Sequence, residues 1–179
     1  MPSSRHSSAV LKNSRAFGDG MTQLTLITVG SLKEDYLKTA LDEYKKRLGA
    51  FCRVEEIELK EVRIANEEDA GEIERALAEE GERILAKIPK GSYTIALCVE
   101  GKEYDSPSLA ALLGRAADAT GKITLIIGSS HGLAPAVKAA AKERLSVSLL
   151  TFPHQLMRVI LAEALYRSFS ILAGKKYHK

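Results

Sequence analysis

The chain has 179 residues, of which 45% are hydrophobic and 27% charged, and its formal net charge is +3. This length accommodates one globular domain with a sizeable core, and the composition excludes a disordered or fibrous chain. No apolar run approaches the roughly 18 residues of a membrane span, so we expect a soluble protein with no membrane partner. Cys52 and Cys98 lack a partner at metal or redox spacing, which favours reduced thiols in the cytoplasm.

The first twenty residues are rich in Ser and Arg and lack the apolar stretch of a secretory signal. We expect residues 1–20 to be a disordered N-terminal extension, and residues 21–179 to form a single domain. The four histidines have no regular spacing to one another or to cysteine, so the sequence predicts no metal site.

From Met21 onward the hydrophobic pattern alternates between strands and helices. The first half predicts, in order, a buried strand at 24–29, a helix at 33–48, a half-exposed strand at 52–59 and an acidic helix at 67–88. The second half predicts a buried strand at 93–99, a helix at 106–120, a buried strand at 123–127, a short Ala-rich helix, a strand at 145–150 and a helix at 153–172. Continuous apolar strands separated by helices are typical of an α/β fold, a parallel sheet with helices on both faces.

Ligands of such folds bind beyond the carboxyl ends of the strands. Three predicted loops qualify, those after Val99, Ile127 and Leu150. The loop after Ile127 matches the G-x-S-x-G pattern of serine hydrolases, with Ser130 as nucleophile and with Glu163 and His178 following in the order of an α/β-hydrolase. The domain is short for such an enzyme, and a serine hydrolase is kept as an alternative.

The predicted helix at 153–172 begins with a proline after a strand, so its backbone N–H groups form a positive end. His154 and Arg158 are four residues apart and therefore share a face of this helix. The helix is apolar nearly all round, which is more than one sheet can bury, so we expect it to pack against a second copy in a homodimer.

The tail after this helix is basic and carries an aromatic side chain. Gly174 is expected to end the helix in the left-handed conformation. The residues that follow could contact phosphate and stack on a base: Lys175, Lys176, Tyr177, His178 and Lys179. A non-catalytic RNA-binding module is therefore a second alternative.

Five segments together resemble one family: LTLITVGSLKEDYLKTALDEYKKRL, GERILAKIP, IIGSSHGL, TFPHQLMRVILAEALYRSF and the closing YHK. They are similar to the 23S rRNA (pseudouridine-N3)-methyltransferase H family, minimal members of the SPOUT superfamily. The resemblance runs from about Met21 to Lys179, with the motifs in matching order and spacing. It implies a homodimeric α/β domain with a C-terminal trefoil knot, S-adenosylmethionine as cofactor, and large-subunit ribosomal RNA in the ribosome as substrate.

The resemblance also implies roles for individual residues. The cofactor would be bound by Leu97, Gly128, Val147, Ser148, Leu149, Leu150, Thr151 and Phe152. Loss of the N3 proton places negative charge on the flanking carbonyl oxygens, and Arg158, Tyr177 and His178 are the candidate catalytic residues that would stabilise it. RNA would be contacted by His154, Arg167, Lys175, Lys176 and Lys179.

Two positions depart from the family pattern. Ser129 stands where the family usually has glycine, and a requirement for positive φ or close approach there would cost about 1 kcal/mol. The tail has Ala173, Gly174, Lys175 and Lys176 where the family usually has Arg-Gly-Glu. An arginine contact to RNA is then either lost or supplied by the two lysines.

Overall fold

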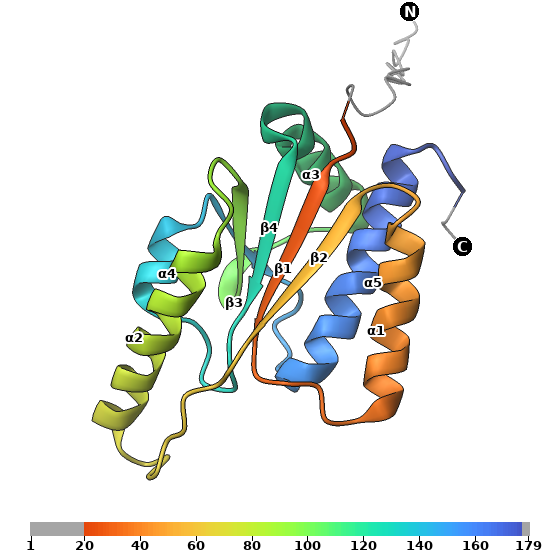
Figure 1. Ribbon diagram of the computed structural model, residues 1–179. Coiled ribbons are helices and arrows are strands. Elements are labelled where there is room, and N and C mark those ends of the chain that lie inside the picture. The colour runs from red at the N-terminus through yellow and green to blue at the C-terminus, as the bar shows by residue number, and fades with distance from the viewer. Residues whose placement is uncertain (1–19, 177–179) are drawn as a thin grey trace, which may run out of the picture.

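The structure, a computed structural model, describes residues 20–176. Five strands form one sheet in the order β2-β1-β4-β3-β5, and every neighbouring pair is parallel (Figure 1). The strands are β1 (Gln23–Val29), β2 (Arg53–Leu59), β3 (Tyr93–Glu103), β4 (Lys122–Ile127) and β5 (Glu143–Ser146). The predicted α/β fold with a parallel sheet is confirmed.

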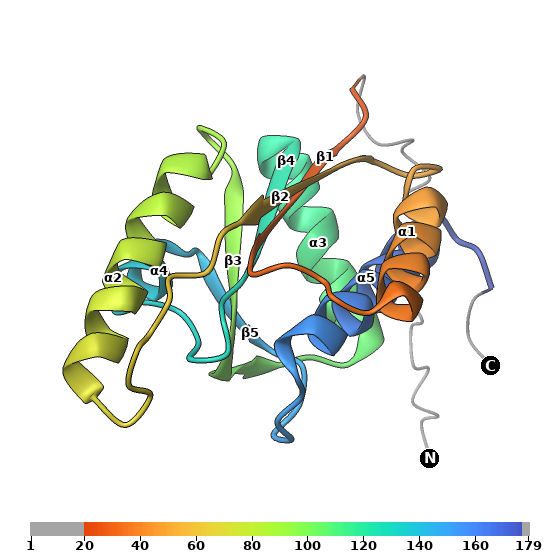
Figure 2. The same ribbon diagram turned by 60° about the horizontal axis from the view of Figure 1, so that its bottom comes forward.

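Helices cover both faces of this sheet. The helices are α1 (Asp35–Leu48), α2 (Ala70–Lys87), α3 (Ser106–Thr120), α4 (Pro135–Ala140) and α5 (His154–Leu172). One face carries α2 and α4, and the other carries α1, α3 and α5 (Figures 1 and 2). Among residues 20–176, no helix combines the length and the apolar character that crossing a membrane requires.

The core follows from the two-residue period of the strands. In β1, Leu24 and Leu26 point toward the face with α3 and α5, whereas Ile27 and Val29 point toward the face with α2 and α4. β1 and β4 are buried on both faces of the sheet, which explains their continuous apolar sequence. α5 lies between α1 and α3, so part of its apolar circumference is buried within a single chain.

The expectation for residues 145–150 is wrong in its second half, because β5 ends at Ser146. Ser146 Oγ donates to the carbonyl oxygen of Ser148 at 3.1 Å, and Leu150 N donates to Ser148 Oγ at 3.0 Å. Such local bonds compete with a strand ladder. Leu149 and Leu150 are therefore exposed at 77% and 70%, although their sequence resembles that of a buried strand.

The expected end of the third strand at Val99 is also wrong, since β3 continues to Glu103. Leu97 and Lys102 both pair with Leu145, so the residues between them bulge out of the ladder. Gly101 lies in this bulge, and a Cβ there would lie 2.6 Å from the carbonyl carbon of Leu145. Glycine is required here because the backbones of β3 and β5 approach so closely.

Candidate functional site

A cavity of about 690 Å³ lies at the carboxyl ends of β3, β4 and β5. Figure 2 brings this edge of the sheet forward. The cavity is built from residues 97–100 of β3, residues 127–133 at and after the end of β4, and residues 145–148 and 150–154 from β5 to the start of α5, together with Lys138 and Met157. Its volume lies within the range of small-molecule sites, and its position agrees with the expectation for a parallel α/β sheet.

The structure brings the predicted cofactor residues together at this cavity, with one exception. Its lining includes Leu97, Gly128, Val147, Ser148, Leu150, Thr151 and Phe152. Leu149 does not line it and projects outward. The sequence did not single out Cys98, Glu100 or Lys138, which also line the cavity. Cys98 and Glu100 follow Leu97 in β3, where the sequence predicted the strand to end, so the strand pattern could have indicated them. Nothing in the pattern pointed to Lys138 on α4.

Residues 128–132 form a tight turn, hereafter the 128–132 turn. Gly132 N donates to the carbonyl oxygen of Ser129 at 2.9 Å, and Gly132 has a φ of +92°. A Cβ on Gly128 would lie 2.1 Å from the carbonyl oxygen of Gly132. Any side chain at position 128 would therefore force the turn open.

Ser129 is buried, with 6% of its surface exposed. Among residues 20–176 every positive φ belongs to a glycine, so Ser129 does not require the left-handed conformation. Its Oγ donates to Glu80 Oε2 on α2 at 2.9 Å. The strain considered for a serine at this position is absent, and its hydroxyl has a buried acceptor.

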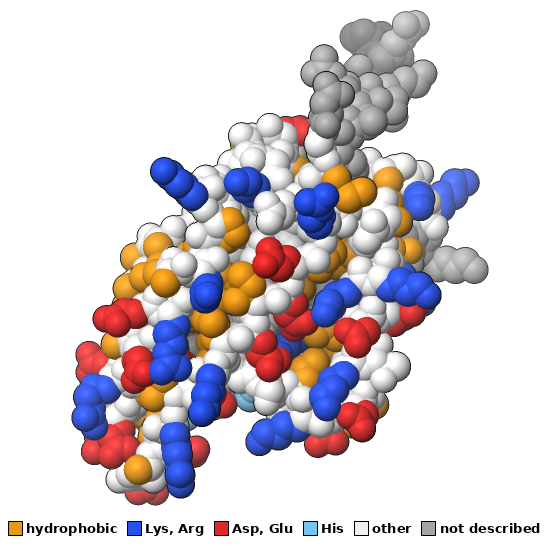
Figure 3. Space-filling view, in the orientation of Figure 1, with side chains coloured by type: hydrophobic (Ala, Val, Ile, Leu, Met, Phe, Trp, Pro, Cys, Tyr) orange, Lys and Arg blue, Asp and Glu red, His pale blue; other side chains and the backbone are white. Residues whose placement is uncertain are grey.

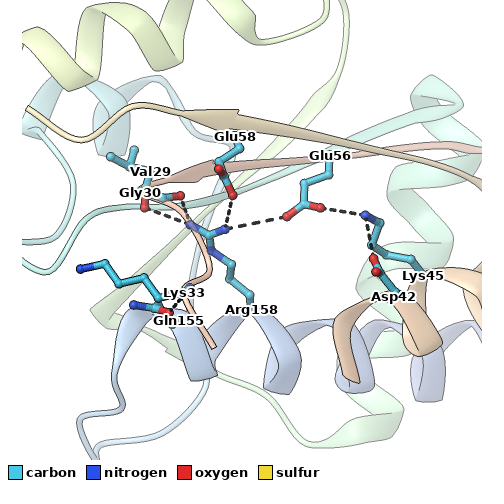
Figure 4. Close-up of polar contacts among 9 residues, drawn as sticks. All are labelled: Val29, Gly30, Lys33, Asp42, Lys45, Glu56, Glu58, Gln155 and Arg158. Atoms are coloured by element: carbon cyan, nitrogen blue, oxygen red, sulfur yellow. Dashed lines mark hydrogen bonds and ion pairs between the residues drawn. The ribbon is translucent and has the colours of Figure 1, made fainter. Parts of the chain in front are cut away.

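His154 and Arg158, which were expected to share a face of α5, point toward different neighbours. His154 and Met157 line the cavity, whereas the Arg158 guanidinium points toward β1 and β2 (Figure 4). The Arg158 side chain is 1% exposed. It donates to Glu58 Oε2 at 3.0 Å and to the carbonyl oxygens of Val29, at 3.2 Å, and Gly30.

A series of ion pairs links Arg158 to α1. Arg158 lies 3.9 Å from a carboxylate oxygen of Glu56, and Glu56 in turn pairs with Lys45 at 2.8 Å. Lys45 is 3.5 Å from Asp42 (Figure 4). The guanidinium is thus neutralised by acidic groups of β2 and linked to the surface of α1, which is how a buried cation is tolerated.

His154 lies at the boundary between this network and the cavity. Its Nε2 and Glu61 Oε2 both lie near Gly30, at 3.6 and 3.4 Å from the place where a Cβ would stand. Burial lowers the pKa of His154, and Arg158 and Lys33 lower it further, while Glu61 opposes the shift. The net shift favours the neutral imidazole at the cavity.

Three of the predicted RNA-binding residues do not line the cavity: Arg167, Lys175 and Lys176. Arg167 pairs with Glu163 one turn earlier on α5, with a closest contact of 2.5 Å. Gly174 ends the helix with a φ of +69°, as predicted. Lys175 Nζ lies 4.7 Å from the centre of the Phe51 ring, and Lys176 is exposed. Tyr177, His178 and Lys179 lie outside the described residues.

The hydrolase alternative fails on geometry. Ser130 Oγ is 3.4 Å from Nδ1 of the adjacent His131 and 3.5 Å from Glu61. Glu163, the expected acid of the triad, bonds Arg167 and does not line the cavity. Ser130 and Glu163 are therefore not brought together, and His178, the third predicted member, lies outside the described residues.

Comparisons with known proteins agree with one another. The family described as "Predicted SPOUT methyltransferase" matches residues 22–178. Ribosomal RNA large subunit methyltransferase H of Exiguobacterium sibiricum is 46% identical over 158 residues, covering 88% of this chain and 99% of that protein. The protein of the same name from Streptococcus thermophilus is 48% identical over 158 residues, with the same coverage.

A solved structure gives a fold-level comparison. The crystal structure of a probable methyltransferase from Bordetella pertussis Tohama I superimposes with a TM-score of 0.51 at 14% identity. It covers 86% of this chain and 96% of that one. This likeness concerns the arrangement of the sheet and helices alone.

Proposed function

Because the chain belongs to the SPOUT methyltransferase family and groups with ribosomal RNA large subunit methyltransferase H, we propose that it methylates N3 of a pseudouridine in 23S ribosomal RNA, with S-adenosylmethionine as methyl donor. The observation that carries the proposal is the cavity at the carboxyl ends of β3, β4 and β5, which gathers the segments that the resemblance assigns to the cofactor. Ribosomal RNA, in the assembled ribosome of the cytoplasm, is the proposed partner.

The residues at the cavity fit such a cofactor. An adenosyl group needs an apolar surface and nearby backbone groups, and the segment at 147–152 offers both, with Leu150 and Phe152 among its side chains. Because Gly128 has no Cβ, the 128–132 turn can stay tight where it lines the cavity. The cofactor would supply a methyl group already activated on a sulfonium sulfur. The protein has to position N3 of the base in line with that methyl group.

The remaining chemistry concerns the N3 proton and the charge left on the base. We assign stabilisation of that charge to Tyr177 and His178 of the tail, which supply a phenol and an imidazole. Arg158 supports the site indirectly, because its guanidinium holds the first turn of α5 against the ends of β1 and β2. The same turn presents His154 to the cavity, where a neutral imidazole could contact the base or accept a proton.

The active form that we propose is a homodimer in which the tail of one subunit completes the cavity of the other. α5 has 19 residues and is therefore about 28 Å long. Its first turn adjoins the cavity, while Lys175 beyond its other end lies against Phe51. Two residues of chain span at most about 7 Å, much less than the length of α5, so we assign Tyr177 and His178 to the cavity of the partner subunit.

A trefoil knot formed by the segment between β5 and α5 belongs to the same proposal. β5 is the edge strand next to β3, whereas α5 returns beneath the opposite half of the sheet and packs against α1 and α3. The chain at 147–153 makes this crossing at the cavity. A knotted segment would hold the cofactor loop from both sides.

The decisive experiment is transfer of a labelled methyl group from S-adenosylmethionine to ribosomes that lack the modification, followed by mass mapping of the RNA. Label on a single pseudouridine is the expected result. Gly128→Ala, whose Cβ would overlap the carbonyl oxygen of Gly132, is the negative control. Absence of label with the unaltered protein, on ribosomes that a family member methylates, would overturn the proposal.

A further inference from the structure

Glu80 is a buried carboxylate that the chemistry above does not use. It lies in the middle of α2, on the side that faces the sheet, and is 4% exposed. Burial of an ionisable group away from water is costly unless hydrogen bonds compensate for the loss of solvent. The partners of Glu80 therefore indicate what this side chain does.

Glu80 joins two segments that are distant in sequence. Val62 N, in the connection between β2 and α2, donates to Oε1 at 2.9 Å. Ser129 Oγ, in the 128–132 turn, donates to Oε2 at 2.9 Å across a separation of 49 positions. Both carboxylate oxygens are thus engaged, one by each segment.

The next residue of α2 lies against the segment that follows the turn. A Cβ on Gly81 would lie 2.8 Å from Cβ of Ala134, just before α4 begins. Ile84, one turn farther along α2, belongs to the same apolar cluster as Leu133 and Val137. α2 therefore holds the turn by a hydrogen bond and the segment after the turn by close packing.

We infer that Glu80 is a positioning residue of the cofactor site, which it controls through its hydrogen bond to Ser129. Ser129 lines the cavity through the 128–132 turn, while Glu80 itself does not reach the cavity. A carboxylate that accepts from both the turn and the β2–α2 connection fixes the turn more tightly than backbone bonds alone. This inference rests on the proposed function, because it concerns binding of that cofactor.

The inference also explains how the structure accommodates a buried serine hydroxyl at position 129. A hydroxyl at position 129 would be a buried, unsatisfied donor if no acceptor lay nearby. Glu80 supplies that acceptor at 2.9 Å, and the backbone at Ser129 needs no positive φ. Ser129 and Glu80 therefore act as one unit.

The test measures the affinity for S-adenosylhomocysteine, the product of methyl transfer, by titration calorimetry, alongside the thermal unfolding midpoint. Loss of a hydrogen bond to a charged acceptor lowers affinity about tenfold where it orders a binding loop, so we expect that change for Ser129→Ala and for Glu80→Gln. The double variant should lose no more than about tenfold, since both changes break the same contact. Ser129→Thr keeps the hydroxyl and should retain affinity within about threefold.

A matched control is available on the opposite face. Ser168 is fully buried, and its Oγ donates to the carbonyl oxygen of Ala164 at 2.8 Å. Ser168→Ala therefore also removes a buried hydroxyl, but it should leave the affinity unchanged. The KM for S-adenosylmethionine should rise in Ser129→Ala while kcat changes less, because the hydrogen bond between Ser129 and Glu80 acts on cofactor binding.

The outcomes separate the inference from the proposed function. If the unaltered protein binds neither S-adenosylhomocysteine nor S-adenosylmethionine, the proposed function fails. If it binds and Ser129→Ala binds equally well with a lowered unfolding midpoint, Glu80 is only a structural residue and the inference is overturned. Should Glu80→Gln fail to fold, the affinities of Ser129→Ala and Ser129→Thr still test the inference, because only Ser129→Thr keeps the hydroxyl.

Discussion

Arg158 donates a hydrogen bond to Glu58 at 3.0 Å and thereby joins the first turn of α5 to the carboxyl end of β2. The two side chains differ in environment, because Arg158 is 1% exposed and Glu58 is 45% exposed. The guanidinium also satisfies carbonyl oxygens of Val29 and Gly30, where β1 ends. Arg158 therefore connects three elements at the edge of the sheet that bears the cavity.

We expect Arg158→Met to lower the free energy of unfolding by about 3 kcal/mol, since it leaves two buried carbonyl oxygens without this donor. Arg158→Lys should give an intermediate loss, because an ammonium group cannot reproduce the planar fork of the guanidinium. Urea unfolding followed by circular dichroism provides the measurement. The control is Arg83→Met, whose exposed pair with Glu79 should contribute less than about 1 kcal/mol. Equal losses in Arg158→Met and the control would contradict this role for Arg158.

Gly128→Ala tests the 128–132 turn. The new Cβ would stand 2.1 Å from the carbonyl oxygen of Gly132, and relieving that overlap should displace the turn. An overlap of this kind typically costs about 3 kcal/mol, so we expect affinity for S-adenosylhomocysteine to fall about a hundredfold. Gly20→Ala has open space around the added methyl group and should bind normally. Retention of affinity in Gly128→Ala would show that the turn is not part of the binding site.

Sequence patterns predicted the sheet and the edge that bears the site, because both depend on local hydrophobic periodicity and on general rules for parallel folds. They failed where local polar bonds or a close approach of two backbones determine where a strand ends. The strand expected to reach Leu150 ends at Ser146 because Ser148 forms turns with its neighbours. β3 passes Val99 because Gly101 allows it to approach β5.

The partners of Arg158 and Glu80 could not be predicted, for a different reason. Helical spacing placed His154 and Arg158 on one face, but it cannot say which neighbour each side chain meets. Arg158 contacts Glu58 across 100 positions, and Glu80 contacts Ser129 across 49. Such pairings depend on the assembled sheet and leave no periodic signal in the sequence.

The lowered pKa of His154 predicts how stability changes with pH. The folded chain holds His154 below its ordinary pKa of 6.5, chiefly through burial, and also through Arg158 and Lys33. Between the lowered pKa and 6.5 the unfolded chain binds more protons, so the free energy of unfolding should fall as the pH drops through this window. Above pH 6.5, the contribution of His154 to the free energy of unfolding no longer changes with pH.

Urea unfolding at intervals between about pH 5 and pH 8 would reveal this dependence. His154→Gln should flatten the dependence of the unfolding free energy on pH below pH 6.5, because it removes the titrating group. Glu61→Gln should extend the slope to lower pH, since Glu61 raises the pKa of His154 toward its ordinary value. An unchanged slope in His154→Gln would assign the pH dependence to other groups.

The last prediction concerns the division of the site between two subunits. One variant lacks residues 177–179 and keeps an intact cavity, whereas Gly128→Ala keeps the tail and loses the cavity. Each variant alone should be inactive. If the tail acts on the partner's cavity, unfolding and refolding an equal mixture yields dimers of which half are mixed, each with one complete site. The mixture should then recover about a quarter of the activity of the unaltered protein. A tail that serves its own cavity would leave the mixture inactive, because neither subunit would then carry both parts.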